Sequence, residues 1–352
     1  MELCKLLKEI TPPDEAARAA ARRRWDECAK PLGSLGRLET AICDVAALTG
    51  DAANVALSPR AVFVLCADNG VAARGVTQTD SGVTAAVTRA LARGRTSVCR
   101  MAETARCRVV PVDMGVRDFP GCDGVLGRRV GNGTADMTEG AAMTRAQAET
   151  AIMTGMELAR AEAARGTRLL AAGEMGIGNT TTASALAAVL LDRDSDEVTG
   201  RGAGLSDEGL ARKRAAIRRA VAVNRPDPQD ALDALAKLGG FDLAGMCGLF
   251  LGGARHRVPV LLDGFPSAVA ALCAARLCPN AVKAMLASHV SAEPAGELVL
   301  RALGKRPLIT ADMRLGEGTG AVAAMPLLDM ALAVYRDCYT FAEGGIAPYK
   351  PL

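Results

Sequence analysis

Residues 168–191 contain a short apolar run, a glycine-rich turn and a segment of strong helix formers, in that order. The apolar run predicts a β-strand over 168–172, and the alanine-rich segment from 183 onward predicts a helix. In the turn, glycine lets a ligand approach the backbone, while asparagine and threonine are typical helix N-caps. Free amides and the helix dipole would meet there, which favours a bound anion such as phosphate over an ordinary turn. The residues concerned are Gly173, Glu174, Gly176, Gly178, Asn179 and Thr180–Thr182.

Apolar runs and helical segments also alternate along the rest of the chain. Continuous apolar runs predict strands buried on both faces at 61–66, 108–113 and 258–262, with 282–288 and 307–310 as shorter candidates. Two helices are expected within 13–48, and others at 83–105, 144–164, 206–223, 228–238, 241–256, 266–277 and 320–337, with Asp14 and Thr144 as N-caps. This pattern predicts an α/β fold: a Rossmann-like, mostly parallel sheet with helices on both faces.

The helices at the two ends of the chain have no strands between them. We therefore expect residues 1–50 and 320–352 to pack together as a small helical domain, and residues 51–319 to form the α/β domain. In the parallel sheet of such a domain, ligands bind outside the carboxyl ends of the strands. Polar groups follow the predicted strands repeatedly, so we expect them along one edge: Asp68, Asp113, Glu174, Asp263 and His289.

The composition argues against several classes of function. Lysine and arginine number 42 against 39 acidic residues, without a basic block, and aromatic residues make up only 3%, so neither nucleic acid nor a membrane surface is an expected partner. The eleven cysteines include no CxxC pair and there are only two histidines, so we expect reduced thiols, a cytoplasmic protein and no metal site. The N-terminus shows no signal peptide, and no apolar stretch is long enough to span a membrane.

Two carboxylates are candidates for chemistry. Glu317 lies between two glycines in the segment 312–320, where partial desolvation by the rest of the fold would suit it to act as a general base. An exposed turn glutamate is the alternative. Glu174, on the glycine-rich turn, would need a donor such as a ribose hydroxyl or an N–H group, unless it caps the helix. Lys213 is either a phosphate ligand or a surface lysine, and His289 is either a core or a functional histidine.

Seven motifs in order make a specific resemblance. The chain is similar, from about residue 10 to its C-terminus, to the nicotinate-nucleotide–dimethylbenzimidazole phosphoribosyltransferase family of cobalamin assembly. The motifs are KPLGSLGRLE (30–39), ADNGVAARGVT (67–77), GEMGIGNTTTASA (173–185), GRGAG (200–204), PVLLDGF (259–265), SHVSAEPAG (288–296) and DMRLGEGTGA (312–321). The resemblance implies transfer of 5-phosphoribosyl from nicotinate mononucleotide to 5,6-dimethylbenzimidazole, giving α-ribazole 5′-phosphate and nicotinate. It also implies a homodimer that needs no metal or organic cofactor.

The resemblance also implies roles for individual residues. Glu317 corresponds to the general base that takes the proton of the benzimidazole, and Leu315 would line the flat pocket beside it. Lys213 is a further phosphate partner. The nucleotide loop corresponds to Glu174, Gly176, Gly178, Asn179 and Thr180, with Gly202 in a second loop near the ribose phosphate.

The chain departs from the family pattern beside the base pocket. Where the family commonly has a glutamine, this sequence has Asp80 and Ser81, which we expect to border the acceptor base. The acceptor could therefore be another benzimidazole, a purine or a phenol. An oxidoreductase or hydrolase of the same fold would require a dinucleotide fingerprint or a nucleophile triad, and neither is visible. A non-catalytic nucleotide sensor would have lost the two carboxylates, which are present.

Overall fold

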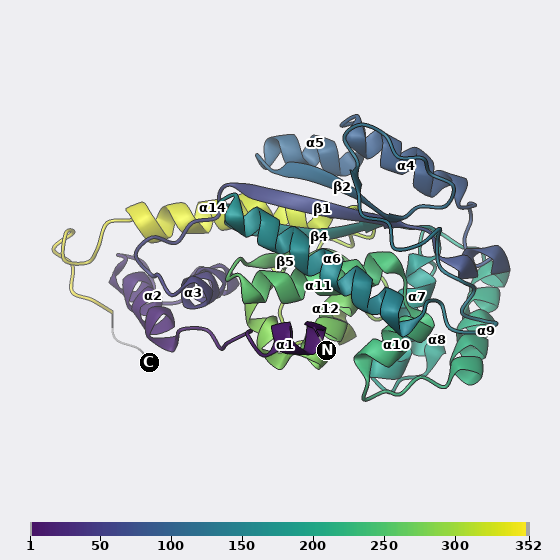
Figure 1. The fold of residues 1–352 in the computed structure, drawn as a ribbon. Coiled ribbons are helices and arrows are strands. Elements are labelled where there is room, and N and C mark those ends of the chain that lie inside the picture. The colour runs from purple at the N-terminus through teal and green to yellow at the C-terminus, as the bar shows by residue number, and fades with distance from the viewer. Residues whose placement is uncertain (1, 350–352) are drawn as a thin grey trace.

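The computed structural model describes residues 2–349 and shows a parallel six-stranded sheet with helices on both faces (Figure 1). The strand order is β3-β2-β1-β4-β5-β6, and every neighbouring pair is parallel. The predicted α/β class is therefore confirmed. The strands are β1 (Arg60–Ala67), β2 (Arg108–Gly115), β3 (Leu126–Gly127), β4 (Leu169–Met175), β5 (Val260–Leu262) and β6 (Met285–Ala287).

The helices cover the sheet in two layers, and short 3₁₀ turns lie at η1 (Gly70–Arg74) and η2 (Pro279–Ala284). The α-helices are α1 (Glu2–Leu7), α2 (Glu15–Glu27), α3 (Arg37–Thr49), α4 (Gly82–Ala92), α5 (Ser97–Thr104), α6 (Arg145–Ala164), α7 (Asn179–Leu190), α8 (Ser195–Val198), α9 (Asp207–Asn224), α10 (Ala231–Leu238), α11 (Phe241–Arg255), α12 (Phe265–Leu277), α13 (Gly296–Ala302) and α14 (Thr319–Asp337).

Strand β1 is buried along its whole length and separates the two layers of the core. Because successive side chains of a strand point to opposite faces, Phe63 and Leu65 join the layer built on α6, α7, α11 and α12. Val62 and Val64 join the layer built on α3, α5 and α14. This two-sided burial explains why the strand reads as an uninterrupted apolar run in the sequence.

Several predicted elements differ from the structure. The helix predicted over 83–105 is two helices, α4 and α5, because Gly94 adopts a left-handed conformation with φ of 66° between them. The strand predicted at 307–310 is reduced to one isolated bridge between Ile309 and His289. The strand predicted from 282 begins only at Met285, since η2 occupies the residues before it. Short helices α1, α8 and α13 were not predicted.

The N-caps of helices α2 and α6 are the predicted residues, whereas the N-cap of α7 is not. Asp14 accepts the amide of Ala17 at the start of α2, and Thr144 forms a capping box with Gln147 at the start of α6, as expected. The N-cap prediction for α7 was wrong. Its N-cap is Gly178, with φ of 95° and no side-chain hydrogen bond, and Asn179 is the first helical residue.

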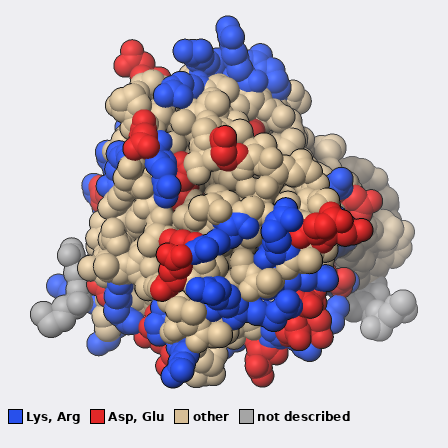
Figure 2. Space-filling model, turned by 90° about the vertical axis from the view of Figure 1, so that its right-hand side faces the viewer, with Lys and Arg blue, Asp and Glu red and all other residues tan. Residues whose placement is uncertain are grey.

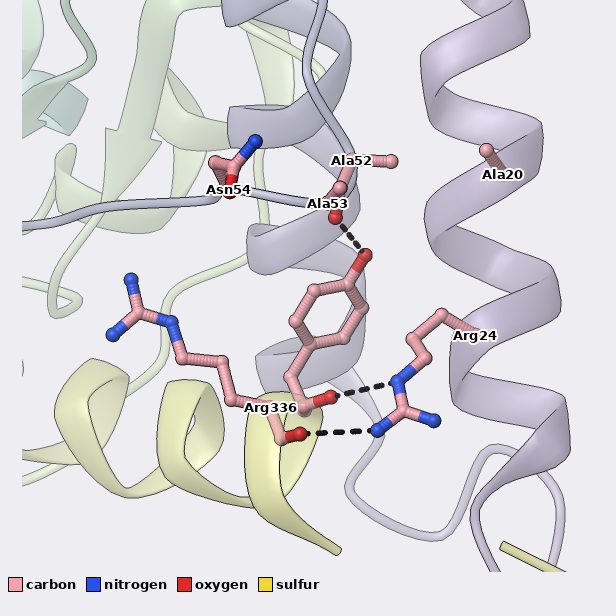
Figure 3. A pocket seen from close by; sticks show the side chains of 7 residues that line it. Ala20, Arg24, Ala52, Ala53, Asn54 and Arg336 are labelled. Carbon is pink, nitrogen blue, oxygen red and sulfur yellow. Dashed lines mark hydrogen bonds between the residues drawn. The ribbon is translucent and has the colours of Figure 1, made fainter.

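Helix α2, near the N-terminus, and the C-terminal end of helix α14 lie side by side (Figure 3). The Arg24 guanidinium of α2 donates to the carbonyls of Tyr335 and Arg336 on α14, and the Tyr335 hydroxyl donates to the Ala52 carbonyl at 2.6 Å. These residues border an open cavity of about 660 Å³. The first half of α14 also packs against α5 and β4, and α1 contacts α11. The division into residues 1–50 with 320–352 and 51–319 remains a prediction.

Charged side chains of both signs are interspersed on the face at the α9 end of the molecule (Figure 2). Salt bridges connect several of them, for example Arg218 with Asp196 at 2.6 Å. Within residues 2–349, no helix combines the length and the apolarity that crossing a bilayer requires.

Helices α6 and α11 approach so closely that glycines of both helices leave no room for a side chain at their contact. A Cβ atom on Gly155 would lie 2.0 Å from the Gly245 carbonyl oxygen, and one on Gly248 would lie 1.9 Å from the Ile152 carbonyl oxygen. We expect Gly155→Ala to lower the free energy of unfolding by about 3 kcal/mol, because two backbones must separate to admit the methyl group. Urea denaturation measures this. Gly140→Ala is the control, since its Cβ would meet no atom within 4 Å, and an equal loss in both variants would contradict the packing argument.

Candidate active site

A cavity of about 430 Å³ opens at the carboxyl ends of the parallel strands. Its wall comes from the segments that follow β1, β4, β5 and β6, together with the loops around 201–205 and 314–317. This is the edge at which a parallel sheet presents its ligand site. The predicted site residues that line it are Glu174, Gly176, Gly178, Asn179, Thr180, Gly202, Leu315 and Glu317.

Glu174 is the penultimate residue of β4, so the strand is longer than predicted and carries this carboxyl into the cavity wall. The Asn179 side-chain amide donates to its Oε2 atom. Burial raises the pKa of Glu174 well above its ordinary value, and the neighbouring carboxylates of Asp242, Asp263 and Glu317 raise it further. The neutral acid is therefore favoured, and it can donate a hydrogen bond as well as accept one.

Glu317 lies directly beside Glu174. Its backbone amide donates to the Glu174 carbonyl at 3.2 Å, and its Oε2 atom accepts the amide of Val98 in α5 at 3.4 Å. The contact that partly shields this carboxylate from water thus comes from a distant part of the chain, as expected for a glutamate between two glycines. Glu317 has a φ of 60°, between Gly316 at 91° and Gly318 at 87°. Three consecutive left-handed residues form a tight arch that presents the carboxylate at the cavity.

A lysine lies behind the part of the cavity wall that contains Thr180. Lys213 is fully buried on α9, and its Nζ atom donates to the Thr180 hydroxyl at 2.9 Å and to the Gly200 carbonyl at 3.0 Å. Burial lowers the pKa of Lys213 to about 8, against the opposing effect of the Glu293 carboxylate. The surface-lysine interpretation is therefore wrong: this ammonium supports the start of α7 and the glycine loop from inside.

Glu293 is a wall residue that the sequence analysis did not assign. Its Oε1 atom accepts the amide of Gly202 at 3.0 Å, and its side chain is buried. The amide expected near the ribose phosphate thus already has a carboxylate partner. The available signal was weak, since Glu293 appeared only as one letter of the SHVSAEPAG motif.

His289 is buried, as expected of a core histidine, and it also lines the cavity, so that a functional role remains a prediction. Its Nδ1 atom lies 3.1 Å from the Ser288 hydroxyl, and the ring packs against Gly320, where a Cβ atom would be 1.9 Å from Nδ1. Burial lowers the pKa of His289, and the nearby Asp263 carboxylate acts in the opposite direction. The neutral ring is favoured.

Apolar side chains also line the cavity. Val76, Val83, Val87 and Met175 line it together with Leu315, whose side chain is 56% exposed at the mouth. A flat aromatic ring suits such walls.

Asp80 and Ser81 are not brought into this site. They precede α4, where the Asp80 carboxylate accepts the amide of Gly82 at 2.9 Å, and neither lines the cavity. This local bond orients Asp80 along the helix start, so its proposed contact with the base has no support in the geometry. Among residues 2–349, no cluster of three or more histidine, cysteine or acidic side chains is arranged to hold a metal ion.

A cavity bordered by an anion-favouring helix start, a carboxylate and apolar side chains is typical of an enzyme acting on a phosphorylated ligand. A family described as phosphoribosyltransferase matches residues 10–346 of the chain. The chain is therefore a phosphoribosyltransferase by family.

Individual relatives define the family more closely. The chain is 43% identical over 349 residues to nicotinate-nucleotide–dimethylbenzimidazole phosphoribosyltransferase of Acetivibrio thermocellus, and 44% identical over 349 residues to that of Desulforudis audaxviator, covering 99% of each chain in both cases. The crystal structure of CobT from Thermus thermophilus is 42% identical, with a TM-score of 0.89 over 95% of this chain and 100% of that one. The chain belongs to the nicotinate-nucleotide–dimethylbenzimidazole phosphoribosyltransferase family.

Proposed function

We propose that this enzyme transfers the 5-phosphoribosyl group of nicotinate mononucleotide to a ring nitrogen of 5,6-dimethylbenzimidazole or a related base. The products are α-ribazole 5′-phosphate, used in cobalamin assembly, and nicotinate. The observation that supports this most directly is that Glu317 and the first turn of α7 border the same cavity, although they are far apart in the sequence. This shared lining supports the proposal that a base and an anion site act on one nucleotide.

The proposed reaction is a displacement at the anomeric carbon. One nitrogen of the benzimidazole forms a bond to C1′ while the bond from C1′ to the nicotinate nitrogen breaks. The electron pair of the broken bond returns to the pyridine ring, which loses its positive charge, so the leaving group needs no proton. The Glu317 carboxylate takes the proton of the benzimidazole N–H, and attack from the opposite face gives the α-product. Positioning and removal of this proton are the main tasks of the enzyme.

The phosphate is assigned to the start of α7 and the Gly202 loop. Lys213 supports this end, because two of its three N–H groups hold Thr180 and Gly200 and its positive charge lies directly beneath them. Because Glu293 already engages the Gly202 amide, the contact of Gly202 with phosphate remains a prediction. The neutral form of Glu174 removes the repulsion that a carboxylate would exert on a bound phosphate, and its hydroxyl suits a ribose oxygen.

Two broader expectations belong to the same proposal. We infer a homodimer in which the partner copy lies near the site, and the exposed Leu315 at the cavity mouth is a surface such a copy or the acceptor ring would cover. Sedimentation equilibrium tests this assembly. The eleven cysteines are all unpaired, which supports a reducing compartment, and the cytoplasmic location remains a prediction.

A direct assay tests the function. Purified protein is incubated with nicotinate mononucleotide and one of a panel of benzimidazoles, purines or phenols, and products are identified by mass spectrometry. We expect release of nicotinate together with an α-nucleotide of at least one benzimidazole. If nicotinate is released only with purines or phenols, the acceptor belongs to one of those classes and not to the benzimidazoles. If nicotinate is released with no acceptor in the panel, the proposed activity is refuted.

A further inference from the structure

Asp263 directly follows β5 and its carboxylate reaches the start of α14. Its Oδ2 atom accepts the amide of Gly318 at 3.0 Å, and its Oδ1 atom accepts the amides of Gly320 at 2.7 Å and Ala321 at 3.1 Å. The side chain is 3% exposed. Three charge-assisted hydrogen bonds in a buried place form a strong anchor for the backbone that follows Glu317.

The segment that receives these bonds is strained. Glu317 adopts a left-handed conformation, which is unfavourable for a residue with a side chain unless the surroundings enforce it. The backbone on its far side is also confined, because a Cβ atom on Gly173 of β4 would lie 2.5 Å from the Gly318 nitrogen. The arch of residues 316–318 is therefore held between β4 and the Asp263 carboxylate.

The Asp263 backbone is itself fixed by a hydrogen bond to helix α12. The Ser267 hydroxyl of α12 accepts the Asp263 amide at 3.1 Å and donates to the Ala172 carbonyl of β4 at 3.0 Å. Strands β4 and β5 are paired at Ala172 and Leu262. Asp263, which anchors the arch, is thus tied to the sheet on both sides, by its position next to β5 and by the Ser267 bridge to β4. Precise placement of a reacting group requires such a rigid support.

We propose that Asp263 is the positioning residue for Glu317: it holds the arch in the left-handed conformation that aims the Glu317 carboxylate at the acceptor base. Asp263 does not line the cavity, so it acts through Glu317 and not on the substrate. The inference rests on the proposed role of Glu317 as general base.

Asp263→Asn tests this role, because the amide keeps the shape but presents N–H groups to backbone donors and cannot accept all three bonds. We expect kcat to fall by about 10- to 100-fold, while the affinity for nicotinate mononucleotide changes less than about threefold. In the Glu317→Gln background, the rate is measured by single turnover at high enzyme concentration. There Asp263→Asn should lower the rate by less than about threefold, since the effects of residues that act as a unit are not additive.

Each outcome separates the two proposals. Wild-type turnover in Glu317→Gln alone refutes the base assignment, whatever Asp263 does. A slow Glu317→Gln variant in which Asp263→Asn exerts its full single-variant effect overturns the positioning role. Asp230→Asn is the matched control, because Asp230 accepts the amides of Leu232 and Asp233 at the start of α10, away from the cavity. It should lower stability without lowering kcat.

If Asp263→Asn does not fold, a milder variant tests the same role. Ser267→Ala removes only the hydroxyl that fixes the Asp263 backbone and leaves the carboxylate in place. We expect kcat to fall by about 3- to 10-fold, and this loss should disappear in the Glu317→Gln background. Persistence of the full loss there would equally overturn the proposal.

Discussion

Glu317→Gln is expected to lower kcat by about 10²- to 10⁴-fold, which is the usual contribution of a well-placed general base. Glutamine preserves the shape of the side chain and its contact with the Val98 amide, but it cannot take the proton of the incoming ring. The start of α7, where we propose that the phosphate binds, is untouched, so the affinity for nicotinate mononucleotide should stay close to that of the wild type. Steady-state release of nicotinate gives kcat, and calorimetric titration gives the affinity.

The control for this variant is Glu297→Gln. Glu297 is an exposed residue of α13 that pairs with Arg301 at 3.0 Å, so the same change of carboxylate to amide should leave turnover unaffected. If Glu317→Gln retains the turnover of the wild type, the proton is removed by another group and the role assigned to Glu317 is wrong. If the variant loses affinity for the nucleotide instead of turnover, Glu317 contributes to binding and not to proton removal.

Lys213→Met is expected to weaken the binding of nicotinate mononucleotide by about 10- to 150-fold, the effect of losing one hydrogen bond to a charged group. Methionine fills a similar volume, but it removes the positive charge beneath the α7 turn and the donors to Thr180 and Gly200. Titration of the variant with the nucleotide measures the loss. Lys237→Met is the control, because this lysine pairs with Asp233 on α10 at 2.8 Å, away from the cavity.

The pH dependence of binding gives a second signature of the same lysine. With a pKa of about 8, Lys213 is protonated below that pH and loses its charge above it. Affinity for the nucleotide should therefore decline as the pH rises through about 8, whereas the second phosphate ionisation near pH 6 is already complete. The Lys213→Met variant should show no such decline. A wild-type affinity that is constant between pH 7 and 9 would contradict this assignment of the charge.

Local patterns were sufficient for many of the elements that surround the site. The apolar run of β1, the capping groups Asp14 and Thr144 and the glycine-rich turn before α7 each depend on residues within a few positions of one another. Two of the predictions failed, one for a local reason and one because of pairing between distant segments. Gly94 separated α4 from α5, pairing with β1 extended β4 to Met175, and this extension turned Glu174 from a turn residue into a strand residue.

Most of the candidate site was also visible in the sequence, but its arrangement was not. The motifs contain Glu317, Glu174 and the loop residues, and Lys213 was a separate candidate, whereas Glu293 and the anchoring role of Asp263 were missed because each acts through a partner distant in sequence. Asp80 was selected for its difference from the family pattern, and its bond to the Gly82 amide depends on a helix start whose orientation the pattern does not specify.

The sequence by itself determined the family, the alternation of strands and helices, and the kinds of group that would gather at the carboxyl edge of the sheet, because these follow from residue type and short-range spacing. The tertiary structure alone decided the strand order, the meeting of Glu317 with Glu174, and the burial that lowers the pKa of Lys213. These features depend on which distant segments pair and exclude water together, and such pairings are fixed by the free energy of the whole fold rather than by any segment of it.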